Sequence, residues 1–196
     1  AAAPITPTPP TTPTTPTGPA GENKVQLAAD NPAANTIAKG AQSVLLSKMN
    51  FCAASEANTI SKIIFTRTGI AADTDISAVK IYEGTTQVGS SQAINSTNHK
   101  ATFSSLNWTI PANSCKTLLV RANTSAAATT GNTPKLTIDS ASDITSTVAL
   151  DGVFPISSNG MTLAGLAVGA LQVATTTPSG TVVAGGIEQG VAGFIL

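Results

Sequence analysis

The fold class of this chain is decided by residues 103–122, which read FSSLNWTIPANSCKTLLVRA. Every second residue is apolar in two runs within this stretch, residues 106–110 and 118–122, and a Pro-Ala-Asn-Ser interruption separates them. Because alternate side chains of an extended strand point to the same face, each run predicts a β-strand with one buried face. The Pro and Asn between the runs predict a turn.

Similar short apolar or alternating runs continue outward from this stretch along the chain. They occupy residues 25–28, 44–51, 60–66, 79–82, 136–138, 153–156 and 161–163. Gly, Asn, Asp, Ser and Pro separate the runs, and no segment keeps a helical period over three turns. Many short strands with frequent turn residues predict an all-β sandwich or barrel.

Composition divides the 196 residues into three parts. Residues 1–22 form a leader with seven Pro and seven Thr in its first nineteen positions, typical of extended polyproline II and of O-glycan attachment. Its opening Ala-Ala-Ala-Pro resembles a mature terminus left after cleavage. We assign residues 23–167 to a β-sandwich domain, and residues 168–196 to an apolar C-terminal β extension.

The C-terminal extension echoes the beginning of the sandwich domain. At an offset of 146, residues 25–28 (VQLA) match 171–174 (LQVA), Pro32 matches Pro178, and residues 37–40 match 183–186; one deletion then aligns 46–49 with 191–194. Five identities at one register, with apolar positions kept, indicate an internal repeat. The repeat holds only the opening strands of a module, so we expect the extension to pack against something else.

Charge and residue usage narrow the possible functions. Ten basic residues balance ten acidic ones, and only 10% of residues are charged, so no basic face for nucleic acid is expected. The chain has a single His and no nucleophile elbow, and we expect neither an enzyme nor a bound cofactor. Its most apolar stretch, residues 161–174, is too short to span a bilayer, so no membrane insertion is expected.

The two cysteines, Cys52 and Cys115, each lie beside the end of an expected strand. One disulfide between them is consistent with an oxidising compartment, where it would join neighbouring segments. The alternative is a pair of free buried thiols.

Three polar positions are candidates for metal binding or catalysis. Asp73 and Asp75 flank one threonine in an extended loop and are calcium candidates if further carboxylates approach them. Solvated turn aspartates are the alternative. His99 lies in a polar turn without a neighbouring nucleophile, so we expect a surface histidine there.

Carbohydrate suggests two further kinds of site. Trp108 and Tyr82 are candidates for a sugar-stacking pair, although Trp108 shares its face with apolar neighbours, which favours the core. Three Asn-X-Ser/Thr sequences are N-glycosylation candidates, at Asn95, Asn107 and Asn123.

Several longer motifs carry a family resemblance. They are residues 74–77 (TDIS), 80–89 (KIYEGTTQVG), 110–118 (IPANSCKTL), 154–156 (FPI) and 159–163 (NGMTL). Together they resemble the β-sandwich modules repeated in large surface and S-layer-like proteins of bacteria with reduced genomes. The resemblance spans residues 24–196 and implies an extracellular, Ig-like module without catalytic residues. Cys115 departs from the family pattern, in which a small polar residue is usual.

These observations lead to two hypotheses about function. The first is an extracellular structural subunit at the cell surface that polymerises with copies of itself by strand exchange, a terminal segment completing the sheet of a neighbour. The apolar positions expected at that subunit interface are Leu171, Val173, Val182, Val183, Val191, Phe194 and Ile195. The alternative is a module of a bacterial adhesin or S-layer protein that binds a surface glycan or a host surface.

Overall fold

A computed structural model describes residues 21–167, 174–176 and 193–195 of the chain. One sheet of the sandwich has the order β1-β3-β9-β5-β6, with every neighbouring pair antiparallel. Its strands are β1 (Lys24–Leu27), β3 (Val44–Ala53), β9 (Ser114–Thr124), β5 (Ile76–Glu83) and β6 (Thr86–Gln87). Strand β1 therefore forms one edge of this sheet.

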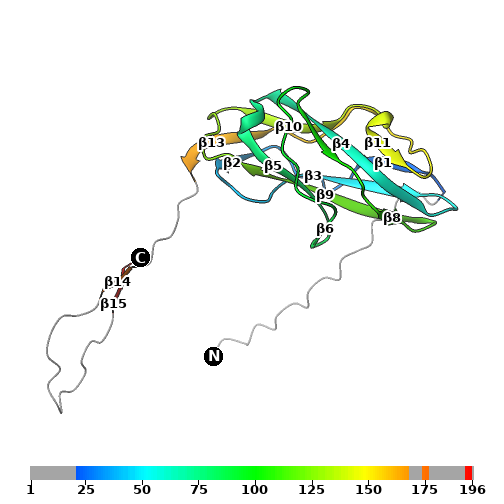
Figure 1. The fold of residues 1–196 in the computed structure, drawn as a ribbon, viewed down its shortest axis with the longest axis horizontal. Helices are drawn as coiled ribbons and strands as arrows, with labels where there is room; N and C mark the ends of the chain where they lie inside the picture. The colour runs from blue at the N-terminus through cyan, green and yellow to red at the C-terminus, as the bar shows by residue number, and fades with distance from the viewer. Residues whose placement is uncertain (1–20, 168–173, 177–192, 196) are drawn as a thin grey trace, which may run out of the picture.

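The second sheet has the order β11-β4-β10-β12, and two more strands pair with β4. Its strands are β4 (Asn58–Ile70), β10 (Thr133–Ile138), β11 (Ile144–Ser146), β12 (Ile156–Ser157), β7 (Lys100–Phe103) and β8 (Trp108–Ile110). The two sheets stack face to face (Figure 1). The predicted all-β sandwich is confirmed.

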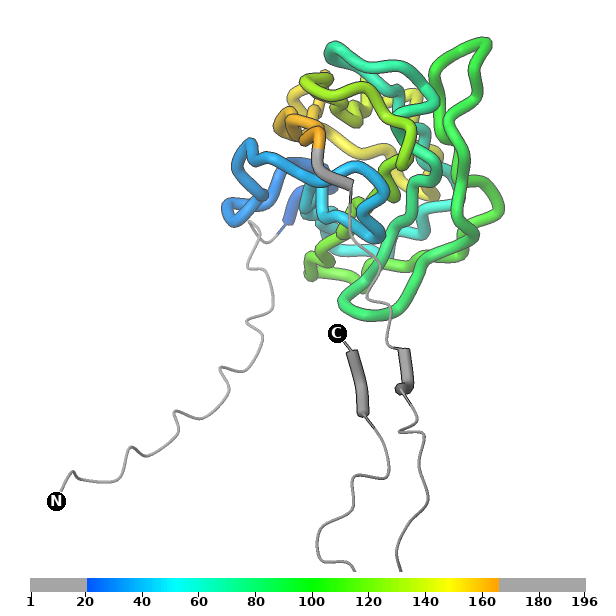
Figure 2. Tube along the Cα trace, turned by 90° about the vertical axis from the view of Figure 1, so that its left-hand side faces the viewer, coloured from blue at the N-terminus to red at the C-terminus, as the bar shows by residue number. Residues whose placement is uncertain are grey.

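Two smaller strand pairs complete the described structure. Strand β2 (Asn35–Lys39) pairs in parallel with β13 (Met161–Ala167). Figure 2 shows β2 and the chain before it on one lateral side of the sandwich, where β2 lies beside β13. Strands β14 (Ala174–Thr176) and β15 (Gly193–Ile195) form a separate antiparallel sheet.

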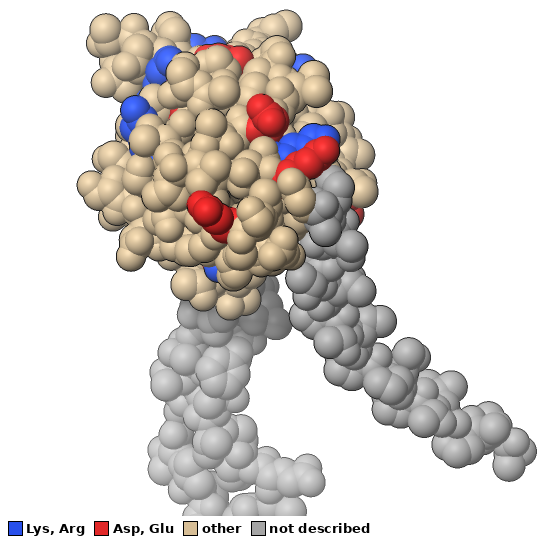
Figure 3. Space-filling view, turned by 90° about the vertical axis from the view of Figure 1, so that its right-hand side faces the viewer, with Lys and Arg blue, Asp and Glu red and all other residues tan. Residues whose placement is uncertain are grey.

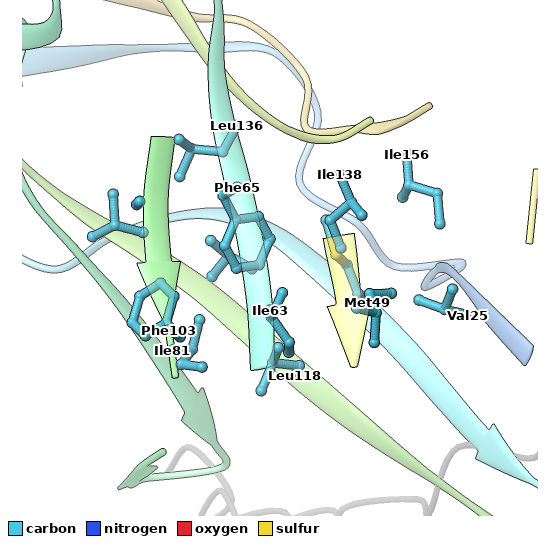
Figure 4. Close-up of a cluster of buried hydrophobic side chains, with 14 of the residues drawn as sticks. Val25, Met49, Ile63, Phe65, Ile81, Phe103, Leu118, Leu136, Ile138 and Ile156 are labelled. Carbon is cyan, nitrogen blue, oxygen red and sulfur yellow. The ribbon is translucent and has the colours of Figure 1, made fainter. Parts of the chain in front are cut away.

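The core lies between the inward faces of the two main sheets, as the alternating sequence requires. Ile63 and Phe65 of β4 are fully buried, whereas the intervening Ile64 is not. Figure 4 shows the side chains of both sheets meeting in this layer. Two aromatic pairs pack edge to face, Phe51 with Trp108 at 5.2 Å and Phe65 with Phe103 at 6.0 Å between ring centroids.

Two short 3₁₀ helices begin strands in the same way. They are η1 (Asp73–Asp75), before β5, and η2 (Ala141–Asp143), before β11. In each, the last residue is a buried aspartate whose carboxylate accepts the backbone N–H three residues earlier, from Ala72 at 2.8 Å and from Ser140 at 3.1 Å. The aspartate thus fixes the turn through which the chain enters the next strand.

The structure corrects one strand expectation and contains several strands outside the expected runs, among them β2, β6, β7 and β11. The run 153–156 is not a continuous strand, because β12 begins only at Ile156 and the Val153 side chain is 88% exposed. Strand β2 was not expected, because its sequence NTIAK lacks a clear alternation.

The surface in Figure 3 carries a few scattered charges among uncharged atoms. No helix in the described ranges is long and apolar enough to cross a membrane.

Candidate assembly edge

One lateral side of the sandwich is closed by residues 24–40, which we call the edge segment. Its first strand, β1, pairs with β3, and its second strand, β2, pairs with β13. At its start, the Val25 N–H donates to the carbonyl oxygen of Asp151 at 2.8 Å. The edge segment therefore begins at the edge of the first sheet and ends in the separate β2–β13 pair, held by short backbone pairings.

A groove of about 390 Å³ lies between β1 and β12, and its lining includes the exposed Val153 and Pro155. The Ala28 N–H donates to the carbonyl oxygen of Lys48 in β3. In an antiparallel pair, the backbone N–H and C=O groups of successive residues point alternately toward and away from the partner strand, so those of Leu27 point away from β3. On the β12 side of the groove, the Ser158 N–H donates to the carbonyl oxygen of Leu136. By the same alternation, the backbone N–H and C=O groups of Ser157 point away from β10. Two strand edges thus face this groove.

A second hollow, of about 270 Å³, lies beneath the connection between β1 and β2. Its lining comprises residues 32–35, Ile37, Val44, Leu45 and Met161. Of the apolar side chains that the edge segment turns toward the core, Val25 is fully buried, but Leu27 and Ile37 are only partly buried. The edge segment is therefore less tightly packed than the strands beneath it.

Positions that are identical in the internal repeat have physical roles in the edge segment. Ala28, matched by Ala174, is only 5% exposed and bonds through its N–H to β3. Gly40, matched by Gly186, has a φ of +74°, a left-handed conformation that glycine adopts without strain, and its N–H donates to Ser125 O at 3.1 Å. The repeat thus preserves residues needed for this local structure.

The described part of the C-terminal extension is a short antiparallel strand pair. Ala174 of β14 lies opposite Ile195 of β15, and Thr176 lies opposite Gly193. In the repeat alignment β14 corresponds to residues 28–30, which directly follow β1, and β15 corresponds to residues 48–50 of β3. In the sandwich Ala28 bonds to Lys48, whereas its match Ala174 lies opposite Ile195, the match of Asn50, so the two registers differ by two residues.

Only two of the seven residues expected at the subunit interface lie within the described part of the chain. Phe194 and Ile195 belong to β15. The other five, Leu171, Val173, Val182, Val183 and Val191, lie outside the described residues.

Cys52 and Cys115 form a disulfide in the structure. They lie directly opposite each other on β3 and β9. Lys24 of β1 is paired with Cys52 on the other side of β3. The covalent link therefore fastens the two central strands, and β1 is held to β3 by noncovalent interactions.

Asp73 takes part in an ion-pair cluster at the start of η1. Its carboxylate accepts from Arg67 Nε at 2.8 Å and contacts His99 Nδ1 at 2.7 Å. Burial raises the pKa of Asp73, but the hydrogen bonds from Arg67 and His99 outweigh it and hold the pKa below its usual value. His99 is exposed, as expected, and also ties its turn to η1.

Asp75 anchors a neighbouring loop. Its carboxylate accepts from Thr129 N–H at 2.8 Å and from Asn132 Nδ2 at 2.6 Å, besides its bond from Ala72. Burial raises the pKa of Asp75, but these bonds outweigh it and lower the pKa below its usual value. No group of three or more His, Cys, Asp or Glu gathers within the described ranges. Both calcium candidates are engaged in protein contacts.

The two aromatic candidates do not form a sugar-stacking pair. Trp108 is 4% exposed, and its Nε1 donates to Glu83 at 2.7 Å, which places it in the core as expected. Tyr82 is half-buried beneath the guanidinium of Arg121, and its hydroxyl donates to Gln87 at 3.1 Å.

The three N-glycosylation candidates differ in accessibility. Asn107 is exposed in the loop between β7 and β8. Asn95 is also exposed, but its side-chain oxygen accepts the N–H of Thr97 at 2.8 Å. Asn123 is half-buried in β9 and accepts from Ser43 N–H at 2.9 Å. Of the three, Asn107 offers the freest approach.

Comparison with known proteins identifies no family. No protein-family model matches this chain, and no curated protein sequence is significantly similar to it. The function therefore has to be inferred from the edge segment and its repeat.

Proposed function

We propose that this protein is an extracellular structural subunit that assembles by exchanging β-strands between neighbouring sandwiches. One observation carries the proposal: the chain contains a second copy of the sequence that closes an edge of its own sandwich. Ala28 and Gly40, which have local structural roles, recur in that second copy as Ala174 and Gly186.

The acceptor side of the exchange is an edge that short strands cover. Strand β1 has four residues and β2 has five, and both run at the lateral side of the sandwich. A protein normally protects such an edge, because open backbone groups pair readily with another chain. Here the same protein supplies a matching segment, so a second copy is a suitable partner.

The donor side is the C-terminal extension. Each copy carries one donor segment and one acceptor edge, formed by different parts of the chain, so the contact is heterologous. A heterologous contact propagates from copy to copy and gives a filament when its rotation does not close a ring. The Cys52–Cys115 disulfide suits an oxidising, extracellular setting for such an assembly.

The test is the assembly state of the full chain. We expect its mass by light scattering to grow with concentration, and negative-stain images to show linear particles. A variant lacking residues 168–196 should remain monomeric, whereas a matched variant lacking residues 1–20 should assemble normally. A full chain that stays monomeric across a wide range of concentrations would exclude the proposal.

A second candidate function, glycan binding by an adhesin or S-layer module, is favoured by one polar hollow. It has a volume of about 340 Å³, and its lining includes Gln92, Asn95, Asn98, Lys100 and Thr102. Amide, ammonium and hydroxyl groups of this kind hydrogen-bond sugar hydroxyls. A glycan array with a clear hit that is lost in Asn98→Ala and kept in Tyr82→Phe would support this function. Absence of any hit would count against it.

A further inference from the structure

We infer that residues 170–186 of one copy replace the edge segment, residues 24–40, of a second copy and pair with its β3 and β13. This inference rests on the proposed function and specifies its acceptor surface and register. The donor could in principle bind its own sandwich, add beside β1, or replace β1 and β2. The geometry distinguishes these three arrangements.

The donor cannot occupy the equivalent place on its own sandwich. Ala170 matches Lys24 and follows Ala167, the last residue of β13, by three residues, which span at most about 11 Å. Strand β13 alone is about 20 Å long, and its end lies beside Lys39. Strand β1 lies toward the opposite end of the sandwich from β13 (Figure 1), and its first residue, Lys24, forms a bridge with Asp151. In-register replacement therefore requires another molecule.

Simple addition of a strand beside β1 is also disfavoured. The groove between β1 and β12 ends on one side at the bridge between Lys24 and Asp151. Its lining reaches only Leu27 and Ser157, and the chain beyond Leu27 continues into β2, which is paired with β13. A strand of useful length would have to break one of these pairings, whereas a segment that replaces the edge segment re-forms both.

The donor sequence fits the vacated place at the positions that face the core. The fully buried Val25 would be replaced by Leu171, and the partly buried Leu27 by Val173. Gln172 would occupy the outward position of Gln26, opposite Asn50 of β3. The donor thus keeps the alternation of apolar and polar side chains that β3 requires.

Further along, Val183 would take the place of Ile37 opposite Leu163 of β13. Two contacts with Lys48 of β3 are not reproduced. Thr176 stands where Asp30 pairs with the Lys48 ammonium, and Thr177 stands where the Asn31 side-chain oxygen accepts the Lys48 N–H at 2.9 Å. The Asp30 side chain is 71% exposed, and an exposed ion pair contributes little to stability. The two segments can therefore compete for the same edge.

The decisive experiment locks the edge segment in place. Gln26 and Asn50 lie opposite each other with outward side chains, so the variant Gln26→Cys/Asn50→Cys can form a disulfide between β1 and β3. We expect the oxidised variant to remain monomeric at concentrations at which the wild type assembles. Its matched control, Gln26→Ser/Asn50→Ser, should assemble like the wild type. Peptide mapping verifies both disulfides in the locked protein.

The outcomes separate this inference from the proposed function. If the wild type assembles and the locked variant assembles equally well, replacement of β1 is excluded while strand-based assembly stands. If the wild type itself never assembles, the proposed function fails. Assembly of the serine control but not of the locked protein supports replacement.

A second variant tests the register and does not depend on the first. In Asn50→Cys/Gln172→Cys, the two new thiols of neighbouring copies should meet and give a ladder of disulfide-linked multimers on a non-reducing gel. In the control Asn50→Cys/Thr175→Cys, the second thiol falls out of register, and the ladder should be at least tenfold weaker. Equal ladders from both variants would overturn the inferred register.

Discussion

The centre of the sandwich and its edge segment are fastened in different ways. Strands β3 and β9 share nine residue pairs and a disulfide, and the side chains they turn inward are fully buried. Strand β1 has four pairs with β3, and β2 has an interrupted pairing with β13. The difference teaches that one chain can combine a covalently fastened centre with an edge held by few noncovalent pairings, which is what the proposed strand exchange requires.

The largest expected effect concerns the covalent link at the centre. We expect Cys52→Ser/Cys115→Ser to lower the free energy of unfolding by about 4 kcal/mol, because the disulfide restricts a long loop in the unfolded chain. Urea denaturation measures the loss, and the reduced wild type is its control. A loss below about 1 kcal/mol would show that the centre does not depend on the bond.

Matched truncations compare the two regions directly. Leu118 and Val25 are both fully buried, one at the centre and one at the edge. Leu118→Ala should lower the free energy of unfolding by about 3 kcal/mol. Val25→Ala should lower it by only about 1–2 kcal/mol, because the loss cannot exceed the free energy that docks the edge segment.

Amide hydrogen exchange sharpens this comparison. Val25→Ala should speed exchange at the Ala28 N–H while the amides of β9 keep their wild-type rates. Equal acceleration in both strands would mean that the edge segment opens only when the whole domain unfolds.

Asp75 is connected to the edge segment through two backbone hydrogen bonds. Its carbonyl oxygen accepts the Ser125 N–H, and the carbonyl oxygen of Ser125 accepts the Gly40 N–H. Asp75→Ala should cost about 2 kcal/mol by leaving the Thr129 N–H and the Asn132 amide without their acceptor. Urea denaturation at pH 7 checks the loss. A cost near zero would show that water replaces the carboxylate.

Acid should lower the free energy of unfolding through the carboxylates of Asp73 and Asp75. The pKa values of Asp73 and Asp75 are lowered in the folded protein, so their contribution is complete above about pH 4, the range of an unfolded aspartate. It is lost as the pH falls through the lower folded values. Urea midpoints between pH 2 and 7 should decline at the acid end, and less steeply in Asp75→Asn.

The smallest effect isolates the backbone of the edge segment. A Cβ at Gly40 would meet Ala126 at an ordinary 3.7 Å, so Gly40→Ala tests the positive φ rather than a clash. We expect a loss of about 1 kcal/mol in the free energy of unfolding. Gly40→Asn should lose less, because asparagine tolerates the left-handed region. Equal losses from Ala and Asn would contradict this explanation.

The sequence predicted those features that depend on local alternation. Leu106, Trp108 and Ile110 were expected on one face, and all three are buried. The same reasoning separated Ile63 from Ile64. It failed at Val153, where the apolar run suggested a strand and the side chain is exposed.

The candidate site was only partly accessible from the sequence. The repeat between the edge segment and the C-terminal extension is visible as letters alone. Strand β2 was not, since its parallel partner β13 is more than a hundred residues away and its own sequence carries little periodicity. The contacts among Arg67, Asp73 and His99 were missed for the same reason.

The sequence by itself determined the all-β class and the buried faces of most strands, because alternation is a property of neighbouring residues. It also showed the similarity between the opening segment and the C-terminal extension, because that comparison needs only the order of the residues. The tertiary structure alone decided which strands became edges, where Cys52 met Cys115 on β3 and β9, and that the end of β13 lies far from the start of β1. These facts follow from pairings between distant segments, whose choice depends on the packing of the whole core.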